Sequence, residues 1–420
     1  MMTMLIALAA ATQAVAPLPT MTRTTTPASW VDPATGHRIV RIDATPGNYA
    51  LYFNYNPFTP QGDLMIYLTP EGIRVVDLKS WATRLVLKAK VDRLLFAGPR
   101  SRTAYYTTKD AAVDDGGPFA VWRVDLDTGT TRKIADVPGG RIEAINADET
   151  LLAGERELAP PPPAIAAQGR RDPKTGAPNY TGVGPDGKPL SFGAAKAQWM
   201  AARLAAKVPM EMYSVAIEDG RRRTIHRATD WLNHVQFSPT DPTLLMFCHE
   251  GPWDQVDRIW TIRTDGRELN KVHQRTMAGE IAGHEFWSPD GRTIWYDLQT
   301  PAKQVGWLAS YDVRSRARSR YLLAADQASF HFTQSRDGRV FAGDGSAAGK
   351  YISLFTPRSV ATPQPGLITP GTLDTERLAS LATHDYTLEP NEHFTPDGKW
   401  IVYRTNMEGA PAIYAVATER

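Results

Sequence analysis

Four polar residues recur at one position relative to a repeated segment in the second half of the sequence. Counted three residues back from the start of each copy, they are His234, His284, His331 and Asn391. Imidazole and amide groups can ligate metals, and imidazole also transfers protons near neutrality. A single buried histidine can equally be a structural residue bonded to a neighbouring strand. Because the four positions are equivalent, the pattern favours one shared site.

Two neighbouring stretches place a His–Glu pair among large apolar side chains. They read "FCHEGPWDQVDRIW" and "AGHEFWSPDG", and a chain built for stability alone would favour Val or Ile at such places. The pairs are His249–Glu250 and His284–Glu285. The glutamates would line the site or orient the histidines as hydrogen-bond acceptors. Both stretches are therefore candidate parts of the site.

An internal repeat defines these positions. Each copy has an opening residue, a turn rich in Pro, Asp, Gly or Asn, and a β-rich segment, as in "WSPDGRTIWYDL". The spacing is roughly 40 to 60 residues with one longer gap, which is typical of propeller blades and not of helical solenoids. The seven copies begin at Phe58, Phe96, Ile145, Phe237, Trp287, Gln334 and Phe394.

The repeat predicts an all-β fold. Each copy and the strands that follow it read as a four-stranded antiparallel blade, and one such sheet cannot bury both of its faces. Seven blades stacked around an axis solve that problem, so we predict a single seven-bladed β-propeller over residues 25–420. Equivalent positions then lie at one height around the axis, and the four polar residues converge on one end of the central channel.

One segment does not fit the repeat. Residues 158–191 are too rich in Pro and Gly for a blade, and they are either a lid that crosses one face or a disordered linker. The Ala-, Leu- and Met-rich segment 192–207 that follows has helical periodicity. We therefore expect one insert over residues 158–207, consisting of a loop and a short helix.

Composition excludes several classes of function. The net charge of +2 over 420 residues gives no basic field for nucleic acid, and the single cysteine excludes an internal disulfide or a multi-thiolate metal site. No run is long enough to span a membrane, and no G-x-S-x-G, Walker or dinucleotide motif occurs. Acidic pairs for glycoside hydrolysis remain open, because Asp and Glu are plentiful and their separations are unknown.

The N-terminus resembles a secretory signal. Residues 1–16 contain a short apolar run followed by small residues, although the usual early Lys or Arg is missing. This pattern predicts a periplasmic or secreted protein. The alternative is a frayed, Ala-rich tail on a cytoplasmic protein.

The motifs of the second half resemble one family. "FCHEGP", "VDRIW", "AGHEFWSPDG", "DGRVFAGDG" and "FTPDGKWIVYRTN" are similar to segments of the oligogalacturonate lyases, which are seven-bladed β-propeller enzymes of pectin breakdown. The resemblance is dense from about Met210 to the C-terminus and thin before Leu158. It implies β-elimination on digalacturonate with manganese or a similar divalent ion.

The resemblance also implies roles for single residues. His284 matches the family's proposed general base, and imidazole is suited to accept the proton alpha to a uronate carboxylate. Arg258 matches an arginine that binds substrate near the reacting carboxylate. The alternative for Arg258 is an ion pair with Asp254 or Asp257. His331 matches a metal ligand.

The remaining ligands depart from the family pattern. Where the family has a "Q-x-x-H-P-H" run, this chain reads "HDYTLEPNEHFTPD". We expect His384, Glu389 and Asn391 to complete a metal site with His331. Carboxylate and amide oxygens are harder ligands than imidazole, which favours Mn²⁺, Ca²⁺ or Mg²⁺ over zinc.

The implied partner is a short uronate oligosaccharide, with no nucleic acid and no membrane; the oligomeric state stays open. We expect four residues to contact this substrate: His234, His249, Glu250 and Arg275, although an exposed loop arginine is the ordinary interpretation of the last. Trp253 and Trp287 either stack on a sugar ring or pack between blades. The alternative function is a non-catalytic periplasmic propeller that serves as a binding scaffold.

Overall fold

The computed structural model describes residues 28–110, 113, 116–168, 179–361 and 367–420. The predicted signal segment, residues 1–16, lies outside these ranges. Within them, no helix is both long enough and apolar enough to cross a bilayer.

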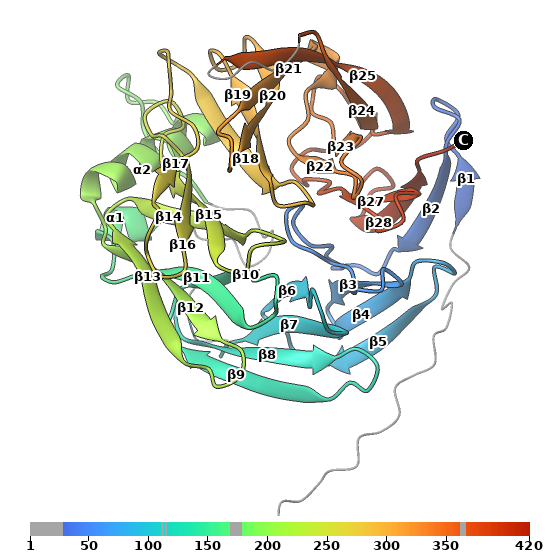
Figure 1. Ribbon diagram of the computed structural model, residues 1–420, viewed down its shortest axis with the longest axis horizontal. Helices are drawn as coiled ribbons and strands as arrows, with labels where there is room; N and C mark the ends of the chain where they lie inside the picture. The colour runs from blue at the N-terminus through green and yellow to red at the C-terminus, as the bar shows by residue number, and fades with distance from the viewer. Residues whose placement is uncertain (1–27, 111–112, 114–115, 169–178, 362–366) are drawn as a thin grey trace, which may run out of the picture.

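The described strands form seven units, each a run of antiparallel strands around a common centre (Figure 1). This arrangement confirms the predicted all-β propeller and is consistent with seven blades. The first three units are β3 (Leu64–Thr69), β4 (Gly72–Asp77) and β5 (Thr83–Lys88); β6 (Arg93–Ala97), β7 (Thr103–Thr108), β8 (Phe119–Asp125) and β9 (Thr131–Val137); and β10 (Arg141–Ile145), β11 (Leu151–Glu157), β12 (Met210–Ala216) and β13 (Arg222–Ala228). The next two are β14 (Trp231–Phe237), β15 (Leu244–Glu250), β16 (Ile259–Arg263) and β17 (Asn270–Lys271); and β18 (Ile281–Trp287), β19 (Thr293–Gln299), β20 (Gly306–Asp312) and β21 (Arg318–Leu323). The sixth is β22 (Phe332–Gln334), β23 (Phe341–Gly343), β24 (Tyr351–Ser359) and β25 (Ile368–Ser380).

The seventh unit closes the ring with strands from both ends of the chain. It contains β26 (His393–Phe394), β27 (Trp400–Thr405) and β28 (Ala412–Ala417), followed in the sheet by β2 (Arg38–Asp43) and β1 (Ser29–Val31). The β2–β28 pairing is antiparallel and places Ile39 opposite Val416. Units five and six are joined as well, because β21 and β25 pair in parallel at their outer edges.

The hydrophobic core lies between neighbouring units. Seven clusters of buried side chains each combine residues from two adjacent sheets, and together they complete the circle. One cluster, for example, packs Leu64 of β3 against Leu94 of β6, and another packs Val402 of β27 against Met65 of β3. Each sheet therefore buries both faces, which a single blade cannot do alone.

The predicted insert leaves the third unit between β11 and β12. It contains α1 (Pro163–Ala166) and α2 (Phe192–Ala206), so the predicted short helix is confirmed. Ser191 caps α2 by accepting a hydrogen bond from the Ala194 amide. The ring of Trp199 meets that of Trp231 edge-on at 5.3 Å, which seats the helix on the fourth unit. A short 3₁₀ helix, η1 (Ala325–Gln327), connects units five and six.

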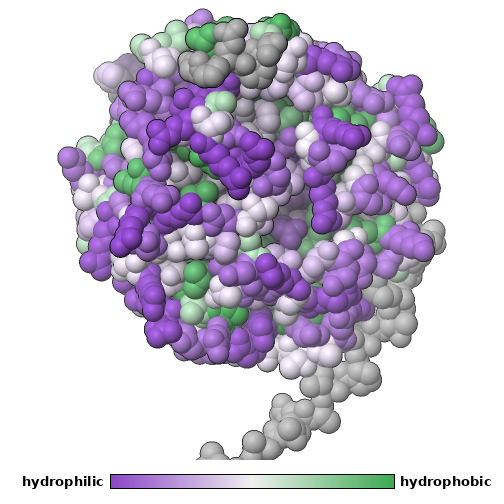
Figure 2. All heavy atoms as spheres, viewed as in Figure 1, coloured by the Kyte–Doolittle hydropathy of each residue, from purple (hydrophilic) through white to green (hydrophobic). Residues whose placement is uncertain are grey.

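The chain between β2 and β3 runs into the middle of the ring (blue in Figure 1). There Phe53 joins the core cluster between units five and six, and Tyr52 packs against it. Around this region, Figure 2 shows a face on which hydrophilic residues predominate, with a hollow near its middle.

Candidate active site

One hydrogen bond recurs in every unit and aligns the seven units with one another. The first turn residue after the innermost segment donates its backbone N–H, at 2.8–3.0 Å, to the carbonyl of the first residue of the next strand or, in unit six, of the residue directly before that strand. These turn residues are Thr59, Gly98, Asn146, Ser238, Ser288, Ser335 and Thr395. Counted four residues back, units four to seven carry His234, His284, His331 and Asn391. The structure thus places the four predicted residues at equivalent positions.

Three of these residues have left-handed backbone conformations. φ is 51° at His234, 50° at His284 and 51° at Asn391. In β14 and β18 they lie in β-bulges, where the pairing skips from Asn233 to Gln236 and from Gly283 to Phe286. A non-glycine residue in this conformation costs about 1–3 kcal/mol, and such strain concentrates at functional sites. The bulge also redirects the side chain relative to a regular strand.

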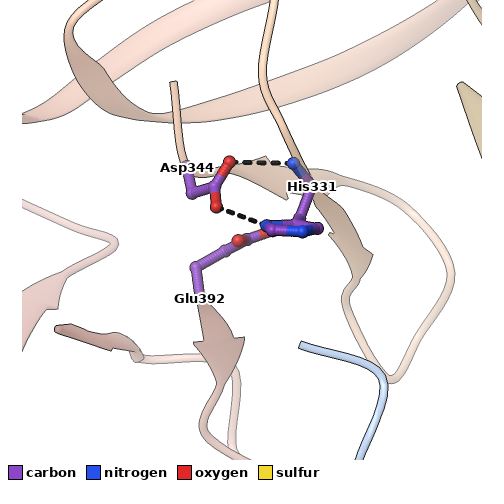
Figure 3. A group of neighbouring side chains, drawn as sticks. All are labelled: His331, Asp344 and Glu392. Carbon is purple, nitrogen blue, oxygen red and sulfur yellow. Dashed lines mark hydrogen bonds and ion pairs between the residues drawn. The ribbon is translucent and has the colours of Figure 1, made fainter. Parts of the chain in front are cut away.

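His331 is held in one orientation by Asp344 (Figure 3). Its backbone N–H donates to Asp344 Oδ1 at 2.8 Å, and its Nδ1 lies 2.7 Å from Asp344 Oδ2. Both side chains are fully buried. Since Nδ1 is taken by the carboxylate, Nε2 is left as the outward-facing nitrogen, and it lies 3.2 Å from the Tyr52 hydroxyl. A carboxylate on the far nitrogen is the usual support of a metal-binding or proton-accepting histidine.

Glu392 completes a buried group with His331 and Asp344. Ligand atoms of the three lie within 4.8 Å of one another. Neither carboxylate oxygen of Glu392 accepts a hydrogen bond within the described part of the chain, although the residue is fully buried. Burial, and then the neighbouring Asp344, raise the pKa of Glu392 well above its usual range. A buried carboxylate without a donor is the kind of group that a cation would stabilise.

Tyr52 lies between the histidines. Its ring centroid is 5.1 Å from that of His331 and 6.4 Å from that of His234. Desolvation, and then the carboxylates of Glu389 and Glu285, raise the pKa of Tyr52, so its phenol is neutral at physiological pH. The sequence offered no signal for this residue, because it precedes the first copy of the repeat.

A second polar group extends from β15 to β18. Glu250 Oε1 accepts a charge-assisted hydrogen bond from Arg258 Nη1 and another from Trp253 Nε1 at 2.9 Å. The Arg258 guanidinium lies 4.4 Å from the centre of the Trp253 ring, and that ring meets His284 edge-on at 5.3 Å. The ring of His284 is in turn 5.1 Å from that of His331.

Gly283 makes this approach possible. A Cβ added at Gly283 would lie 3.3 Å from the Trp253 ring and 3.6 Å from Arg258 Nε. A side chain at this position would require the tryptophan ring to shift by a few tenths of an ångström, whereas its contact with the guanidinium would be an ordinary one.

Arg258 and Glu250 form a buried ion pair, and 2% and 7% of their side chains are exposed. His234 Nε2 lies 3.6 Å from the other carboxylate oxygen. Burial favours protonation of Glu250, but Arg258 and then His234 outweigh it and lower the pKa of Glu250 to about 2. Arg258 pairs with neither Asp254 nor Asp257, so the alternative raised from the sequence is wrong about the partner, although the arginine is ion-paired.

Glu250→Ala is expected to lower the free energy of unfolding by about 3–5 kcal/mol, because it leaves the Arg258 charge buried and uncompensated. Denaturant unfolding at pH 7 measures this change. The matched control is Glu268→Ala, which removes an exposed partner of Arg263 and should cost at most about 1 kcal/mol. Equal losses in the two variants would contradict the assignment.

The wild-type advantage over Glu250→Ala should also depend on pH. A carboxyl whose pKa is lowered on folding stabilises fully above its unfolded value, here 4.5, and loses that contribution as pH falls through about 2. The difference between the two proteins should therefore be constant from pH 7 to 5 and shrink below that.

The structure places other predicted residues outside this arrangement. His249 packs against Phe247 and Trp260, with ring distances of 5.3 and 4.9 Å. Because successive side chains on a strand alternate, His249 lies on the opposite face of β15 from Glu250. The structure therefore does not bring His249 together with Glu250 and Arg258.

Arg275 has a structural task. Its Nη2 donates to the Gln255 carbonyl at 2.7 Å, its Nη1 donates to the Asp254 carbonyl, and its backbone N–H bonds to Asp257 at 3.0 Å. The guanidinium thus holds the loop that carries Trp253 in place. Trp287 packs in the cluster between units four and five.

The predicted ligand set is also changed. Both ring nitrogens of His384 are engaged, with Thr405 Oγ1 at 2.8 Å and the Leu388 carbonyl at 2.7 Å, so neither is left to bind a metal. Asn391 accepts from the Phe53 amide at 3.3 Å and donates to the Glu389 carbonyl at 3.1 Å. The Glu389 side chain is exposed. Of the four predicted ligands, His331 alone belongs to the buried group.

Two members of that group were missed from the sequence. Asp344 lies in the quoted "DGRVFAGDG" stretch, and Glu392 directly follows Asn391. A signal was present for Glu392, because it stands at the same distance from its turn residue as Glu285 does in unit five. Asp344 lies in β-strand surroundings that only the fold brings to His331.

Together, fold and site define a β-propeller with histidines and buried carboxylates at its centre. Residues 203–355 match the family model described as oligogalacturonate lyase. The resemblance predicted from the motifs is thereby confirmed, and the chain is similar to the oligogalacturonate lyases.

Two curated relatives support the same similarity. An oligogalacturonide lyase of Pectobacterium atrosepticum is 30% identical over 211 residues, and an oligogalacturonate lyase of Dickeya dadantii is 28% identical over 211 residues. Each alignment covers 48% of this chain and 53% of the relative, so the chain spans about half the length of the curated relatives it matches.

Solved structures extend the likeness in fold to nearly the whole chain. An oligogalacturonate lyase in complex with manganese superposes with a TM-score of 0.71 and 24% identity over 96% of both chains. An oligogalacturonate lyase from Vibrio parahaemolyticus gives a TM-score of 0.71 and 22% identity over 94% of this chain and 96% of that one.

Proposed function

We propose that this protein is a lyase that cleaves short oligogalacturonates by β-elimination, with His284 as the general base and a divalent cation as cofactor. The observation that carries the proposal is the placement of His284, in a strained bulge, with its ring 5.1 Å from the Asp344-supported His331. The similarity of residues 203–355 to the oligogalacturonate lyase family supports the same reaction.

The residues present fit a divalent cation. Glu392 offers two buried carboxylate oxygens without donors, and His331 offers Nε2, with Asp344 fixing the ring. Manganese accepts this mixture of oxygen and imidazole nitrogen ligands, and it accompanies the similar solved lyase. When bound, the cation would supply Lewis-acid stabilisation of the negative charge that develops on the uronate carboxylate.

His284 is free to take the proton alpha to that carboxylate. Neither of its ring nitrogens makes a hydrogen bond within the described chain, and Nδ1 lies 3.8 Å from Asp297 Oδ2. Asp297 thus lies on the Nδ1 side of the ring, and we assign the role of proton acceptor to Nε2 on the other side. His284 takes the alpha proton, the C–O bond on the neighbouring carbon breaks, and a double bond forms between the two carbons. The departing glycosidic oxygen takes a proton from water and leaves as a hydroxyl group.

Arg258 contributes at a distance from the substrate. The Arg258 side chain is buried beside Glu250 and Trp253, with 2% of its surface exposed. It also lies next to Gly283, the neighbour of His284 in the sequence. We infer that it positions Trp253 against His284 and adds positive potential near the developing enolate, in place of a direct contact with the carboxylate.

Incubation of the purified protein with di- and trigalacturonate and Mn²⁺ is expected to generate an unsaturated, ultraviolet-absorbing uronate product. Saturated oligosaccharides lack this chromophore, so absorbance and chromatography of the products measure the reaction directly. Other uronate disaccharides provide the specificity control. Silence across the whole panel would contradict the lyase proposal and favour the non-catalytic scaffold.

A further inference from the structure

Two arginines stand at the same end of the propeller as the histidines. Arg93 begins β6 and Arg141 begins β10. Each lies five residues before the turn residue of its unit, Gly98 or Asn146, which is the position of Gly283 in unit five. Arg93 and Arg141 therefore stand, on the innermost strands of units two and three, one residue before the position that the histidines hold in units four to six.

Arg93 is connected to the site through aromatic and backbone contacts. Its electrostatic neighbours are Tyr55 first, followed by Glu143 and Glu155. The ring of Tyr55 lies 6.3 Å from that of Tyr52, whose hydroxyl faces His331. On the other side, Glu143 accepts a hydrogen bond at 2.9 Å from the amide of Val235, which is the neighbour of His234.

Neither guanidinium is committed to a partner. Among the described residues, neither the half-buried Arg93 nor the exposed Arg141 makes a side-chain hydrogen bond or an ion pair within 4 Å. This contrasts with Arg258, whose guanidinium is occupied by Glu250 and Trp253. The arginine that sequence resemblance assigned to the substrate is thus engaged, whereas these two are free to bind one.

Two carboxyl groups, those of Glu143 and Glu155, lie near the two arginines. Arg141 lies opposite Glu155 in the β10–β11 register. Burial, and then the nearby Glu143, raise the pKa of Glu155 well above its usual range. Both guanidinium groups act electrostatically on Glu155, yet neither is held by a hydrogen bond or ion pair in the described chain, so both can accept a further anion.

We propose that Arg93 and Arg141 form a second carboxylate-binding subsite, which takes the uronate carboxylate of the sugar next to the one that reacts. The inference rests on the proposed function for its choice of ligand. Guanidinium groups suit a carboxylate because they donate two parallel hydrogen bonds to it. The subsite gives the protein a reason to prefer oligomers, since a single galacturonate cannot occupy both the histidine region and the arginines.

The test compares binding of digalacturonate and galacturonate by calorimetry, in a His284→Ala background that prevents turnover. Arg93→Gln and Arg141→Gln are each expected to weaken digalacturonate binding by about 10- to 100-fold, as for loss of a charged hydrogen bond. Galacturonate binding should be unchanged. Arg223→Gln is the matched control, because Arg223 is an exposed arginine of β13 in the same unit as Arg141.

In the active protein the same two substitutions should raise KM for digalacturonate and leave kcat within a few-fold. The subsite is disproved if both variants bind digalacturonate as tightly as the parent, if mono- and disaccharide lose affinity equally, or if the parent does not bind the disaccharide. Arg141 is exposed, so its variant decides the matter even if Arg93→Gln fails to fold. Absence of unsaturated product from wild type with binding differences intact would reject the lyase proposal and retain the subsite.

Discussion

Replacing His284 with alanine is expected to lower kcat for digalacturonate by about 100- to 10,000-fold, which is the usual contribution of a general base. His284 stands in the bulge of β18 with its ring held by Trp253 and facing His331. No other described histidine combines this placement with two ring nitrogens free of hydrogen bonds and a carboxylate beside Nδ1. Steady-state kinetics with saturating Mn²⁺ measure the change.

A matched control separates loss of the base from loss of structure. His249→Ala removes a histidine of comparable burial from the other face of the neighbouring β15, and it should retain kcat within a few-fold. Circular dichroism and thermal unfolding should show both variants folded. A His284→Ala protein with near wild-type turnover would show that another group takes the proton.

Chelation is expected to remove nearly all turnover, and added Mn²⁺ to restore it. Within the chain, Glu392→Gln should weaken Mn²⁺ binding by at least about 10- to 100-fold, because an amide replaces the buried carboxylate that would balance the cation's charge. Activity as a function of Mn²⁺ concentration, and direct calorimetric titration of the apoprotein, measure this affinity.

Glu285→Gln is the matched control for this second prediction. Glu285 is 2% exposed, and both of its carboxylate oxygens are also without hydrogen bonds in the described chain, but it lies outside the His331 group. Its substitution should leave Mn²⁺ affinity unchanged even if stability shifts. Equal Mn²⁺ affinities in Glu392→Gln and wild type would place the cation elsewhere.

The repeat made the fold predictable. Turn residues such as Ser238 and Ser288 recur with the same hydrogen bond. The alignment of the repeats on these residues could be made from the sequence alone. The equivalence of His234, His284 and His331 followed from the same alignment. Local sequence was sufficient here because each blade is formed mostly by consecutive residues. Rotational symmetry then places equivalent residues of different blades around the same centre.

What the sequence could not provide was the direction of individual side chains. His249 and Glu250 are adjacent, so the pleat sends them to opposite faces, and which one faces the centre depends on the register of β15 with its neighbours. The hydrogen bonds that engage both ring nitrogens of His384, with Thr405 and the Leu388 carbonyl, arise from tertiary packing and could not be predicted from the sequence.

Contacts between distant segments were equally hidden. Tyr52 meets His331 across 279 positions of sequence, and Asp344 reaches it only through the folding of unit six. Neither contact has a periodic signature, because each arises from a connecting segment or a hairpin end and not from the repeat itself. The bulges that strain His234 and His284 are likewise backbone features that residue types do not reveal.

The pairing of β2 with β28 determines at which stage of folding the site can form. Ile39 meets Val416, so β2 cannot complete its sheet until β28, far along the sequence, has been synthesised. Tyr52 follows β2 closely, and its delivery to His331 is tied to the same event. Units four to six can assemble their histidines before β28 is made, but the seventh unit is completed only when β2 and β28 pair. The contact between Tyr52 and His331 would then form only once the ring has closed.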